Sequence, residues 1–464
     1  MKSPLPAAAL LELRQQLGED AVLTDPADCL AYGYDNSRRM AQPDAVVFAS
    51  THEQVAAVVR VCLLHSIPLT ARGRGTNTTG ASVPIAGGIV LSLERMNRIL
   101  RISAGDRLLV CEAGALNADV QAAAAEHGLF WAPDPTSAAF SSVGGNLACG
   151  AGGPRAVKYG TARDAVLGLK AVAGNGSTLV TGAATTKSVV GYDLTRLLIG
   201  SEGTLAIITE ATLKLLPKPK YRRLLRAAYS SVHAAADAVA RLMNQAHTPS
   251  ALEFMDGHAV RLAEQYRPTG IPPNTQALLL IEADGDADSL PAAVSAMELA
   301  ASGEGLVELK SAQNSTEAET LWACRKALSP SLRQLAPKKV NEDVAVPVTC
   351  LAELMDGIEK LAAKHALLIV CFGHAGNGNV HVNILANPDD PAVAARIEPC
   401  LRDVFRLVLS LQGTISGEHG VGIDKRDYVA WEIPAETLAF MHAIKRQFDP
   451  SGILNPGKAI PGPD

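Results

Sequence analysis

The residues best suited to chemistry begin with a stretch near the C-terminus, CFGHAGNGNVHVN, at Cys371–Asn383. Apolar residues before the first histidine and alternation after the Gly/Asn run predict two strands joined by a tight turn, because Gly and Asn tolerate positive φ. Residues two apart on a strand share a face, so His381 and Asn383 should point the same way. The antiparallel partner should bring His374 beside them, so that two imidazoles converge on one point.

A second stretch, SGEHGVG at Ser416–Gly422, supplies a carboxylate and a third imidazole. Glu418 completes a His, His, carboxylate set that suits a divalent transition metal with open coordination positions. His419 then remains as a base outside the ligand set. The ordinary alternative for any one of these histidines is a satisfied core or surface residue, and the spacing by itself leaves that alternative open.

The whole chain bounds the classes of protein that can carry this site. A length of 464 residues predicts at least two domains, and a formal net charge of −5 without a basic, aromatic-studded stripe argues against nucleic-acid binding. The eight cysteines form no CxxC pair, which argues against a disulfide framework or an iron–sulfur cluster and favours a reduced cytoplasmic compartment. No stretch has the character of a secretory signal or a membrane span.

The N-terminal half contains three glycine-rich stretches. A β-α-β pattern from residue 45 leads into ARGRGTNTTGAS at Ala71–Ser82, whose N–H groups and hydroxyls suit a pyrophosphate, although a plain surface loop fits this stretch equally well. SSVGGNLACGAGGPRAVKYG at Ser141–Gly160 concentrates glycine in a way that predicts backbone pressed closely against a ligand. Gly200–Pro217 predicts a turn that leads into a long strand.

Six motifs occur along the chain in the order ARGRGTNTTG, VGGNLACGAGG, GYDLTRLLIGSEGTLAIIT, GHAGNGNVHVN, SGEHGVG and FDPSGILNPGK. In this order they resemble the FAD-dependent 2-hydroxy-acid dehydrogenases of the vanillyl-alcohol-oxidase fold. That group contains D-lactate dehydrogenases, the D subunit of glycolate oxidase and D-2-hydroxyglutarate dehydrogenases. The match spans nearly the whole chain. The resemblance implies a bound FAD, held non-covalently because the first loop has no histidine for a covalent link.

The resemblance also implies which residues contact the FAD. The first loop would take the pyrophosphate, the second would line the flavin and adenosine portions, Glu202, Gly203 and Ile207 would lie by the adenine, and Asn455 would return to the flavin. The full set of expected cofactor residues is Arg72, Gly73, Arg74, Gly75, Thr76, Asn77, Thr78, Pro135, Thr136, Ser142, Gly144, Gly145, Asn146, Cys149, Gly150, Gly152, Gly153, Tyr159, Glu202, Gly203, Ile207 and Asn455.

After residue 219 the pattern changes to an α+β cap domain. Strands and helices alternate in the order βαββαβ, which is ferredoxin-like, and the order recurs before residue 425. We therefore predict an FAD-binding domain over residues 1–219, a substrate- and metal-binding cap of two such halves over 220–425, with their strands able to merge into one sheet, and a C-terminal segment over 426–464 that returns to the FAD domain.

The chemistry implied by the resemblance is oxidation of a 2-hydroxy acid, in which FAD accepts a hydride and the protein manages the proton. A metal, zinc or alternatively Mn²⁺ or Fe²⁺, held by His374, His381 and Glu418 would lower the pKa of the substrate hydroxyl. His419 would be the general base, Arg325 would pair with the substrate carboxylate, and Asn383 would donate a further hydrogen bond. An arginine on a helix is more often simply solvated or ion-paired.

One segment of the sequence bears on the choice of substrate. Relatives that oxidise 2-hydroxyglutarate carry a YKYD-like segment where this chain has VNEDVAVP, which replaces a lysine by Asn341 and favours D-lactate over glycolate and D-2-hydroxyglutarate. The acceptor would be a quinone, an electron-transfer flavoprotein or a cytochrome. The protein would be cytoplasmic or peripheral to the inner membrane, and a homodimer is an option. A metallohydrolase and a non-catalytic subunit of an oxidase complex are the alternatives from other classes.

Overall fold

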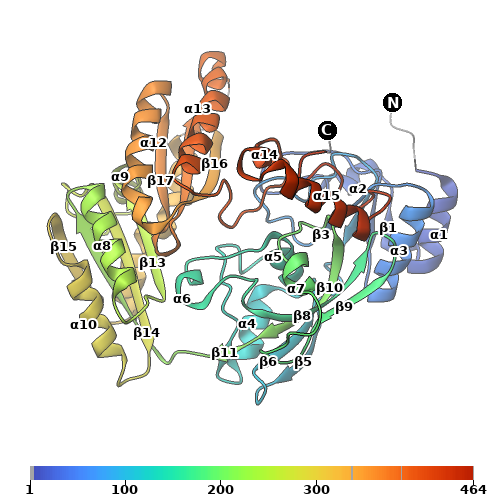
Figure 1. Ribbon diagram of the computed structural model, residues 1–464, viewed down its shortest axis with the longest axis horizontal. Helices are drawn as coiled ribbons and strands as arrows, with labels where there is room; N and C mark the ends of the chain where they lie inside the picture. The colour runs from blue at the N-terminus through green and yellow to red at the C-terminus, as the bar shows by residue number, and fades with distance from the viewer. Residues whose placement is uncertain (1–4, 336–337, 388, 463–464) are drawn as a thin grey trace. The chain divides into compact units, whose positions relative to one another are not determined.

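The computed structural model describes residues 5–335, 338–387 and 389–462. Its chain forms two compact units, each with its own sheets and core (Figure 1). Unit 1 consists of Met1–Gly153, Gly160–Lys218 and Glu418–Asp464, and unit 2 consists of Pro154–Tyr159 and Pro219–Gly417. The chain therefore passes between the units four times.

Unit 1 contains a four-stranded sheet in the order β1-β2-β4-β3 and a five-stranded sheet in the order β5-β6-β10-β8-β9, with β7 and β11 as a separate pair. The elements of unit 1 are α1 (Ala7–Leu17), β1 (Val22–Leu23), α2 (Pro26–Leu30), β2 (Ala45–Phe48), α3 (His52–Leu64), β3 (Leu69–Arg72), β4 (Ile89–Ser92), β5 (Ile99–Ser103), β6 (Leu108–Glu112), α4 (Asn117–Ala125), β7 (Leu129–Phe130), α5 (Val143–Cys149), β8 (Val166–Ala173), β9 (Thr178–Gly182), α7 (Leu194–Leu198), β10 (Ala206–Lys214), β11 (Leu216–Pro217), α14 (Val429–Glu432) and α15 (Ala435–Phe448).

The predicted β-α-β opening is confirmed and places the first glycine-rich loop. β2 and β3 both run parallel to β4, so the loops that follow these strands leave the sheet at the same edge. Thr51 is the N-cap of helix α3, and its side chain accepts a hydrogen bond from the Gln54 N–H at 3.2 Å. Because α3 also packs against β8 and β10, it joins the two sheets into one core.

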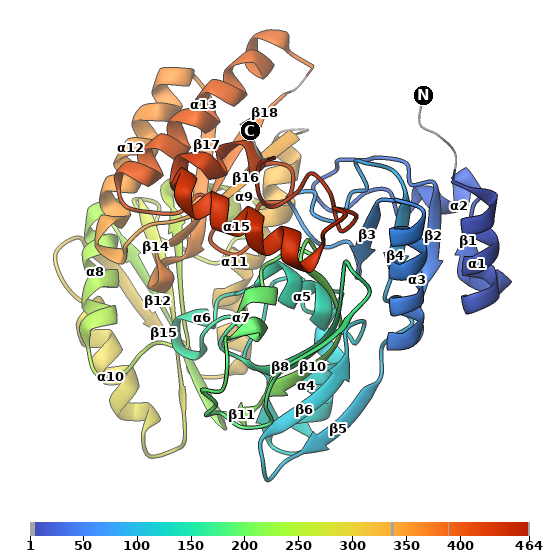
Figure 2. The same ribbon diagram turned by 45° about the vertical axis from the view of Figure 1, so that its right-hand side comes forward.

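Unit 2 is built on one seven-stranded sheet with helices on both faces. Its elements are α6 (Ala156–Tyr159), β12 (Tyr221–Tyr229), α8 (Val232–Asn244), β13 (Ala251–Asp256), α9 (Gly257–Tyr266), β14 (Ala277–Gly285), α10 (Leu290–Ala301), β15 (Leu306–Ser311), α11 (Ser315–Leu335), β16 (Lys338–Ala345), α12 (Leu351–His365), β17 (Leu368–His374), β18 (Asn379–Ala386) and α13 (Pro391–Ser410). Helices α8 and α10 pack side by side, and α9 pairs with α11 (Figures 1 and 2).

The sheet order of unit 2 is that of two ferredoxin-like halves joined edge to edge. The strands run β15-β12-β14-β13-β17-β18-β16, so the first half has its strands in the spatial order 4-1-3-2 and the second continues as 2-3-1. Strands β13 and β17 form the join, where Glu253 is the direct cross-strand partner of His374. The merged sheet is what places a first-half strand beside the histidine hairpin.

Three local expectations needed correction. Helix α9 is absent from the predicted order, because the Asp256–Gly257 pair starts a helix here rather than a turn: the Asp256 side chain accepts from the Ala259 N–H at 2.7 Å. The last predicted strand of the second half is reduced to a single bridge between Thr414 and Ala345. The second glycine-rich stretch contains the helix α5 rather than only loop.

Across the described residues, we find no helix with both the length and the apolar character required to cross a membrane.

Candidate cofactor and metal site

The histidine hairpin forms as the sequence predicts. β17 ends at His374, and the chain reverses through Gly378, whose φ of +65° is easily adopted only by glycine. A Cβ at this position would lie 1.9 Å from the Val346 carbonyl oxygen, so no side chain fits there. The His374 and His381 rings meet edge to face with centroids 5.2 Å apart. The two buried imidazoles therefore lie close enough together to bind one metal ion.

A carboxylate that the sequence analysis did not single out holds His374 in place. Glu253 on β13 uses one oxygen to accept a hydrogen bond from His374 Nδ1 and the other to accept from Arg325 Nε at 2.8 Å. Burial alone would raise the pKa of Glu253, but the interactions with His374 and with the Arg325 guanidinium hold it at about 2. An ionised Glu253 fixes the proton on Nδ1 and leaves His374 Nε2 as the nitrogen able to bind a metal.

The predicted substrate anchor Arg325 therefore has a local partner. It lies on α11, and its guanidinium carbon stands 4.6 Å from the centroid of the Phe372 ring. The bond to Glu253 engages only Nε, one of the five N–H donors that an arginine carries. The carboxylate thus orients both a predicted metal ligand and a predicted substrate contact.

Asp343, on β16, is the second carboxylate that the sequence analysis missed. Its side chain is fully buried, and one oxygen lies 3.4 Å from His381 Nδ1 and accepts from Asn379 Nδ2 at 2.6 Å. Its own strand gave no clear signal, because β16 reads KKVNEDVA and carries several other charged residues. Glu253 did offer a signal, since a charged residue inside the otherwise apolar run ALEFM is unusual unless the charge is paired.

Glu418 and His419 directly follow the end of unit 2. Gly417 donates its N–H to the Asp343 carbonyl oxygen at 3.2 Å. Consecutive Cα atoms are about 3.8 Å apart. Glu418 and His419 therefore lie one and two residues along the chain from Gly417, whose position is fixed by this hydrogen bond. Asn383 is buried and donates from Nδ2 to the carbonyl oxygens of Val370 and His381, each at 3.0 Å.

The expected cofactor residues gather in unit 1, with Tyr159 the exception. The Tyr159 hydroxyl donates to Asp284 in unit 2 at 2.7 Å, beside the ion pair of Lys158 with the same carboxylate. The surrounding burial and the Asp284 charge raise the pKa of the Tyr159 hydroxyl well above its ordinary value. The bond supports the placement of α6 within unit 2.

Three glycine-rich segments of unit 1, far apart in sequence, lie against one another. A Cβ on Gly73 would lie 2.3 Å from the Ser142 hydroxyl, and one on Gly150 would lie 3.5 Å from the Gly200 Cα atom. A Cβ on Gly203 would lie 3.8 Å from the Ala71 side chain. The segments thus pack against one another, and glycine-rich backbone of this kind suits the phosphates of a dinucleotide.

Several of the expected cofactor residues make contacts within the protein instead of facing open space. The Arg72 guanidinium is buried and donates to the Tyr34 carbonyl oxygen at 2.7 Å, and a Cβ on Gly75 would collide with it at 2.2 Å. Burial lowers the pKa of Arg72, although nearby acidic groups oppose this effect. Ile207 is part of the apolar core. A Cβ on Gly153 would lie 2.5 Å from the Asp134 carbonyl oxygen, so packing within the protein requires a glycine there.

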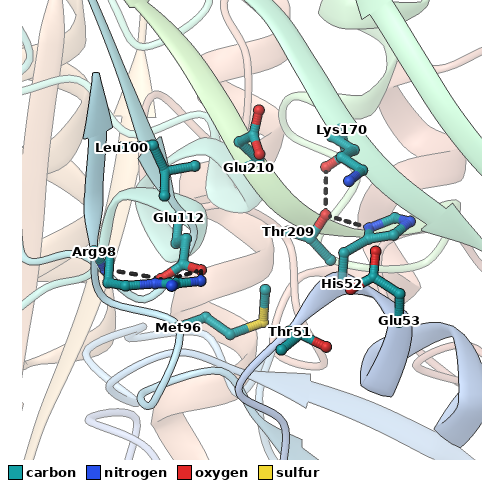
Figure 3. Close-up of a pocket in the computed structure, with 10 residues that line it drawn as sticks. All are labelled: Thr51, His52, Glu53, Met96, Arg98, Leu100, Glu112, Lys170, Thr209 and Glu210. Carbon is teal, nitrogen blue, oxygen red and sulfur yellow. Dashed lines mark hydrogen bonds and ion pairs between the residues drawn. The ribbon is translucent and has the colours of Figure 1, made fainter. Parts of the chain in front are cut away.

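One pocket of unit 1 contains none of the predicted site residues (Figure 3). Several of its polar groups have partners within the protein: His52 contacts the hydroxyls of Thr209 at 2.9 Å and of the neighbouring Thr178 at 2.8 Å, and Arg98 forms a forked ion pair with Glu112. Burial, the larger effect, and Lys170 lower the pKa of His52. These satisfied groups indicate a structural surface feature rather than a ligand site.

Comparisons with known proteins agree with the motif order. A profile of FAD linked oxidases, C-terminal domain, matches residues 218–459, and a profile of an FAD binding domain matches residues 43–182. The chain is 37% identical to glycolate oxidase subunit GlcD of Bacillus subtilis (strain 168) over 96% of this chain and 95% of the relative. It is 34% identical to a D-lactate dehydrogenase of Anaerostipes hadrus over 90% of each chain.

A solved structure supports the same fold. p-Cresol methylhydroxylase with substrate bound superposes with a TM-score of 0.81 and covers 97% of this chain and 96% of its own, at 18% identity. This likeness concerns the fold alone, whereas the full-length relatives above 30% identity establish the family. The chain therefore belongs to the FAD-linked oxidase family, in the group of FAD-dependent 2-hydroxy-acid dehydrogenases with the vanillyl-alcohol-oxidase fold.

Proposed function

We propose that the chain is an FAD- and divalent-metal-dependent dehydrogenase that oxidises a D-2-hydroxy acid, with D-lactate favoured, to the 2-oxo acid. The observation that carries the proposal is the Glu253-locked His374 beside His381 in a chain whose unit 1 gathers the expected FAD residues. Electrons would pass to an external acceptor, a quinone, an electron-transfer flavoprotein or a cytochrome.

The side chains of unit 2 fit a metal by their own chemistry. In unit 2, His374 presents Nε2 and His381 lies against it. The third proposed ligand, Glu418, is the first residue of the last segment of unit 1 and follows Gly417 directly in the chain. Two imidazoles and a carboxylate with open positions suit zinc, and also Mn²⁺ or Fe²⁺. When bound, such an ion lowers the pKa of a hydroxyl that it contacts.

The remaining steps belong to the chain's own residues. Arg325 offers its terminal N–H groups to the substrate carboxylate, and its orientation is set by Glu253. His419 takes the hydroxyl proton, which leaves the substrate carbon ready to give a hydride to FAD. The glycine-rich segments of unit 1 would hold the FAD non-covalently, with their backbone N–H groups toward its phosphates.

The preference for a small monocarboxylic acid rests on the strand pair next to the hairpin. Asn341 on β16 lies directly opposite Asn383 on β18, at the position where the resemblance places a lysine in enzymes for a dicarboxylic acid. An amide gives a second carboxylate no charge partner, so D-2-hydroxyglutarate should react more slowly.

A second candidate is the D-type subunit of a glycolate-oxidising complex. The full-length 37% identity to a glycolate oxidase subunit favours it. The chemistry at the hairpin would be the same, with glycolate as the substrate and other subunits as the acceptor. Cytoplasmic location, with or without contact to the inner membrane, and a homodimer are compatible with either candidate.

Anaerobic flavin bleaching tests both. The purified protein should be yellow and contain about one divalent metal per chain, and D-lactate should bleach the flavin faster than glycolate, D-2-hydroxyglutarate or L-lactate. A colourless protein that hydrolyses esters or amides would refute the dehydrogenase and support a metallohydrolase. Faster bleaching by glycolate would favour the second candidate, and full activity after complete metal removal would refute the metal's role.

A further inference from the structure

The loop that carries His419 is held from one side by a buried carboxylate. Glu202 accepts the Val421 N–H on one oxygen at 2.5 Å and the Gly422 N–H on the other at 2.8 Å. Only 5% of Glu202 is exposed. A Cβ on Gly420 would lie 2.3 Å from the Glu202 carboxylate, so the loop approaches as closely as it does only because glycine stands there.

Asn77 holds the same loop from the opposite end. Its Nδ2 donates to the His419 carbonyl oxygen at 3.0 Å. Its Oδ1 accepts the N–H groups of Thr79 at 2.9 Å and Ala81 at 3.0 Å, which fixes which end of the amide faces His419. The Asn77 side chain is therefore occupied by the turn that it closes and by the His419 loop.

The backbone of the first glycine-rich loop adds a third contact. The Thr79 carbonyl oxygen accepts the Ile423 N–H at 2.9 Å, and a Cβ on Gly422 would lie 2.1 Å from that oxygen. The peptide groups of His419, Val421, Gly422 and Ile423 are thus all engaged within unit 1. Little freedom is left for the backbone that carries the imidazole.

The C-terminal segment braces Glu202 in turn. Asn455 Nδ2 donates to the Glu202 carbonyl oxygen at 2.6 Å and to the Ala81 carbonyl oxygen at 2.9 Å. Lys458 donates to Asn455 Oδ1 at 2.5 Å, so the Asn455 amide is engaged at both ends. Asn455 holds a positive φ of 41°, a conformation that costs free energy unless neighbouring contacts stabilise it.

We propose that Glu202 and Asn77 are positioning residues that fix the backbone of His419, and that their side chains serve this loop rather than the FAD. The inference rests on the proposed function in one respect, the role of His419 as the base. Proton transfer requires the base within hydrogen-bond reach of its target, and a displacement of about 1 Å can cost roughly a hundredfold in rate. The contacts therefore act on the rate of flavin reduction.

The test compares Glu202→Gln, His419→Gln, the double variant and a matched control. In Glu202→Gln, the glutamine carbonyl oxygen can still accept one of the two backbone N–H groups. The NH2 group replaces the second oxygen and cannot accept the other N–H. The control is Glu112→Gln in the pocket of Figure 3, because Glu112 is also a buried carboxylate of unit 1 that accepts a backbone N–H, from Arg98 at 2.9 Å. Each protein is measured for flavin content, anaerobic flavin reduction by D-lactate and hydrogen–deuterium exchange in the peptide 418–425.

We expect Glu202→Gln to retain its flavin, to bind D-lactate within about threefold of wild type and to reduce its flavin roughly 10- to 100-fold more slowly. Amide exchange in 418–425 should be faster, and the double variant should be no slower than His419→Gln alone, because two changes that act through one group are not additive. Glu112→Gln should leave the reduction rate and the exchange of this peptide unchanged.

Flavin loss from Glu202→Gln with a wild-type reduction rate once FAD is restored would overturn the inference, as would unchanged exchange in 418–425. If His419→Gln reduces flavin at the wild-type rate while Glu202→Gln still exchanges faster, the hold on the loop stands and only the base assignment of the proposed function fails. If Glu202→Gln does not fold, Asn77→Ser serves instead. A serine can close the turn but cannot reach the His419 carbonyl oxygen, so the same rate and exchange effects are expected.

Discussion

Replacement of Glu253 by glutamine tests whether Glu253 orients His374 for metal binding or whether the two histidines merely lie close together. Arg325 has only donors to offer, so the carbonyl oxygen of the introduced glutamine must face it and the amide NH2 must face His374. The amide then donates to His374 Nδ1, which places the proton on Nε2. The nitrogen that the metal requires is lost in the stable tautomer.

The expected size of the effect follows from the burial and the charge of Glu253. Loss of such a partner of a metal-bound histidine weakens metal binding by roughly 10- to 100-fold, which is about 1.4–2.7 kcal/mol. Removal of one partner of a largely buried ion pair also costs about 3–5 kcal/mol in the free energy of unfolding. For a unit of about 200 residues, a loss of about 3 kcal/mol lowers the Tm by roughly 6–12 °C.

A zinc competition titration against a coloured chelator measures the first effect, and a thermal melt of the metal-free protein measures the second. The matched control is Glu308→Gln, since Glu308 on β15 pairs with the buried Arg226 in the same sheet at 2.7 Å but contacts no histidine. The control should lose stability and keep its zinc affinity. Wild-type zinc affinity in Glu253→Gln, alongside a lowered Tm, would refute the orienting role of Glu253.

Three further predictions test other parts of the molecule. His381→Ala should lose bound zinc and keep its flavin, because the expected FAD residues lie mainly in unit 1, and loss of flavin absorbance would contradict this. Burial raises the pKa of Asp256 from 3.8 to about 7, so the folded chain binds this proton more tightly than the unfolded chain does. The stability of the wild type should therefore fall as pH rises from about 4 to about 7, whereas Asp256→Asn lacks this titration. Thermal melts at several pH values should show the variant gaining up to about 4 kcal/mol relative to wild type across that range. Gly378→Ala, where φ is +65° and a Cβ would strike the Val346 carbonyl oxygen, should lower the Tm far more than Gly18→Ala, where φ is also positive but the space is open; equal Tm changes would refute the steric argument.

The local elements of this protein are largely legible in its sequence. Short-range patterns, in which neighbouring residues decide the outcome, predict the β-α-β opening and the hairpin that brings His374 to His381. The recurring strand and helix order predicts two ferredoxin-like halves. The order of the six motifs predicts the family, because it samples the whole chain.

What the sequence could not supply is the identity of partners from distant strands. Glu253 reaches His374 across 121 residues because the two halves join through β13 and β17, and no local pattern encodes which edges meet. Helix α9 was missed because an Asp-Gly pair suits a turn and a helix start equally well.

For the glycine-rich loops, too, the sequence does not show which distant groups they contact. Their composition indicates close approach, but only the fold decides what is approached: Gly420 lies against the Glu202 carboxylate, and Gly153 lies against the Asp134 carbonyl oxygen. The sequence by itself thus determines the local elements, the family and the candidate ligands. Tertiary structure alone decides which buried carboxylate lies beside each hairpin histidine, because burial and charge pairing arise only when distant segments are packed together.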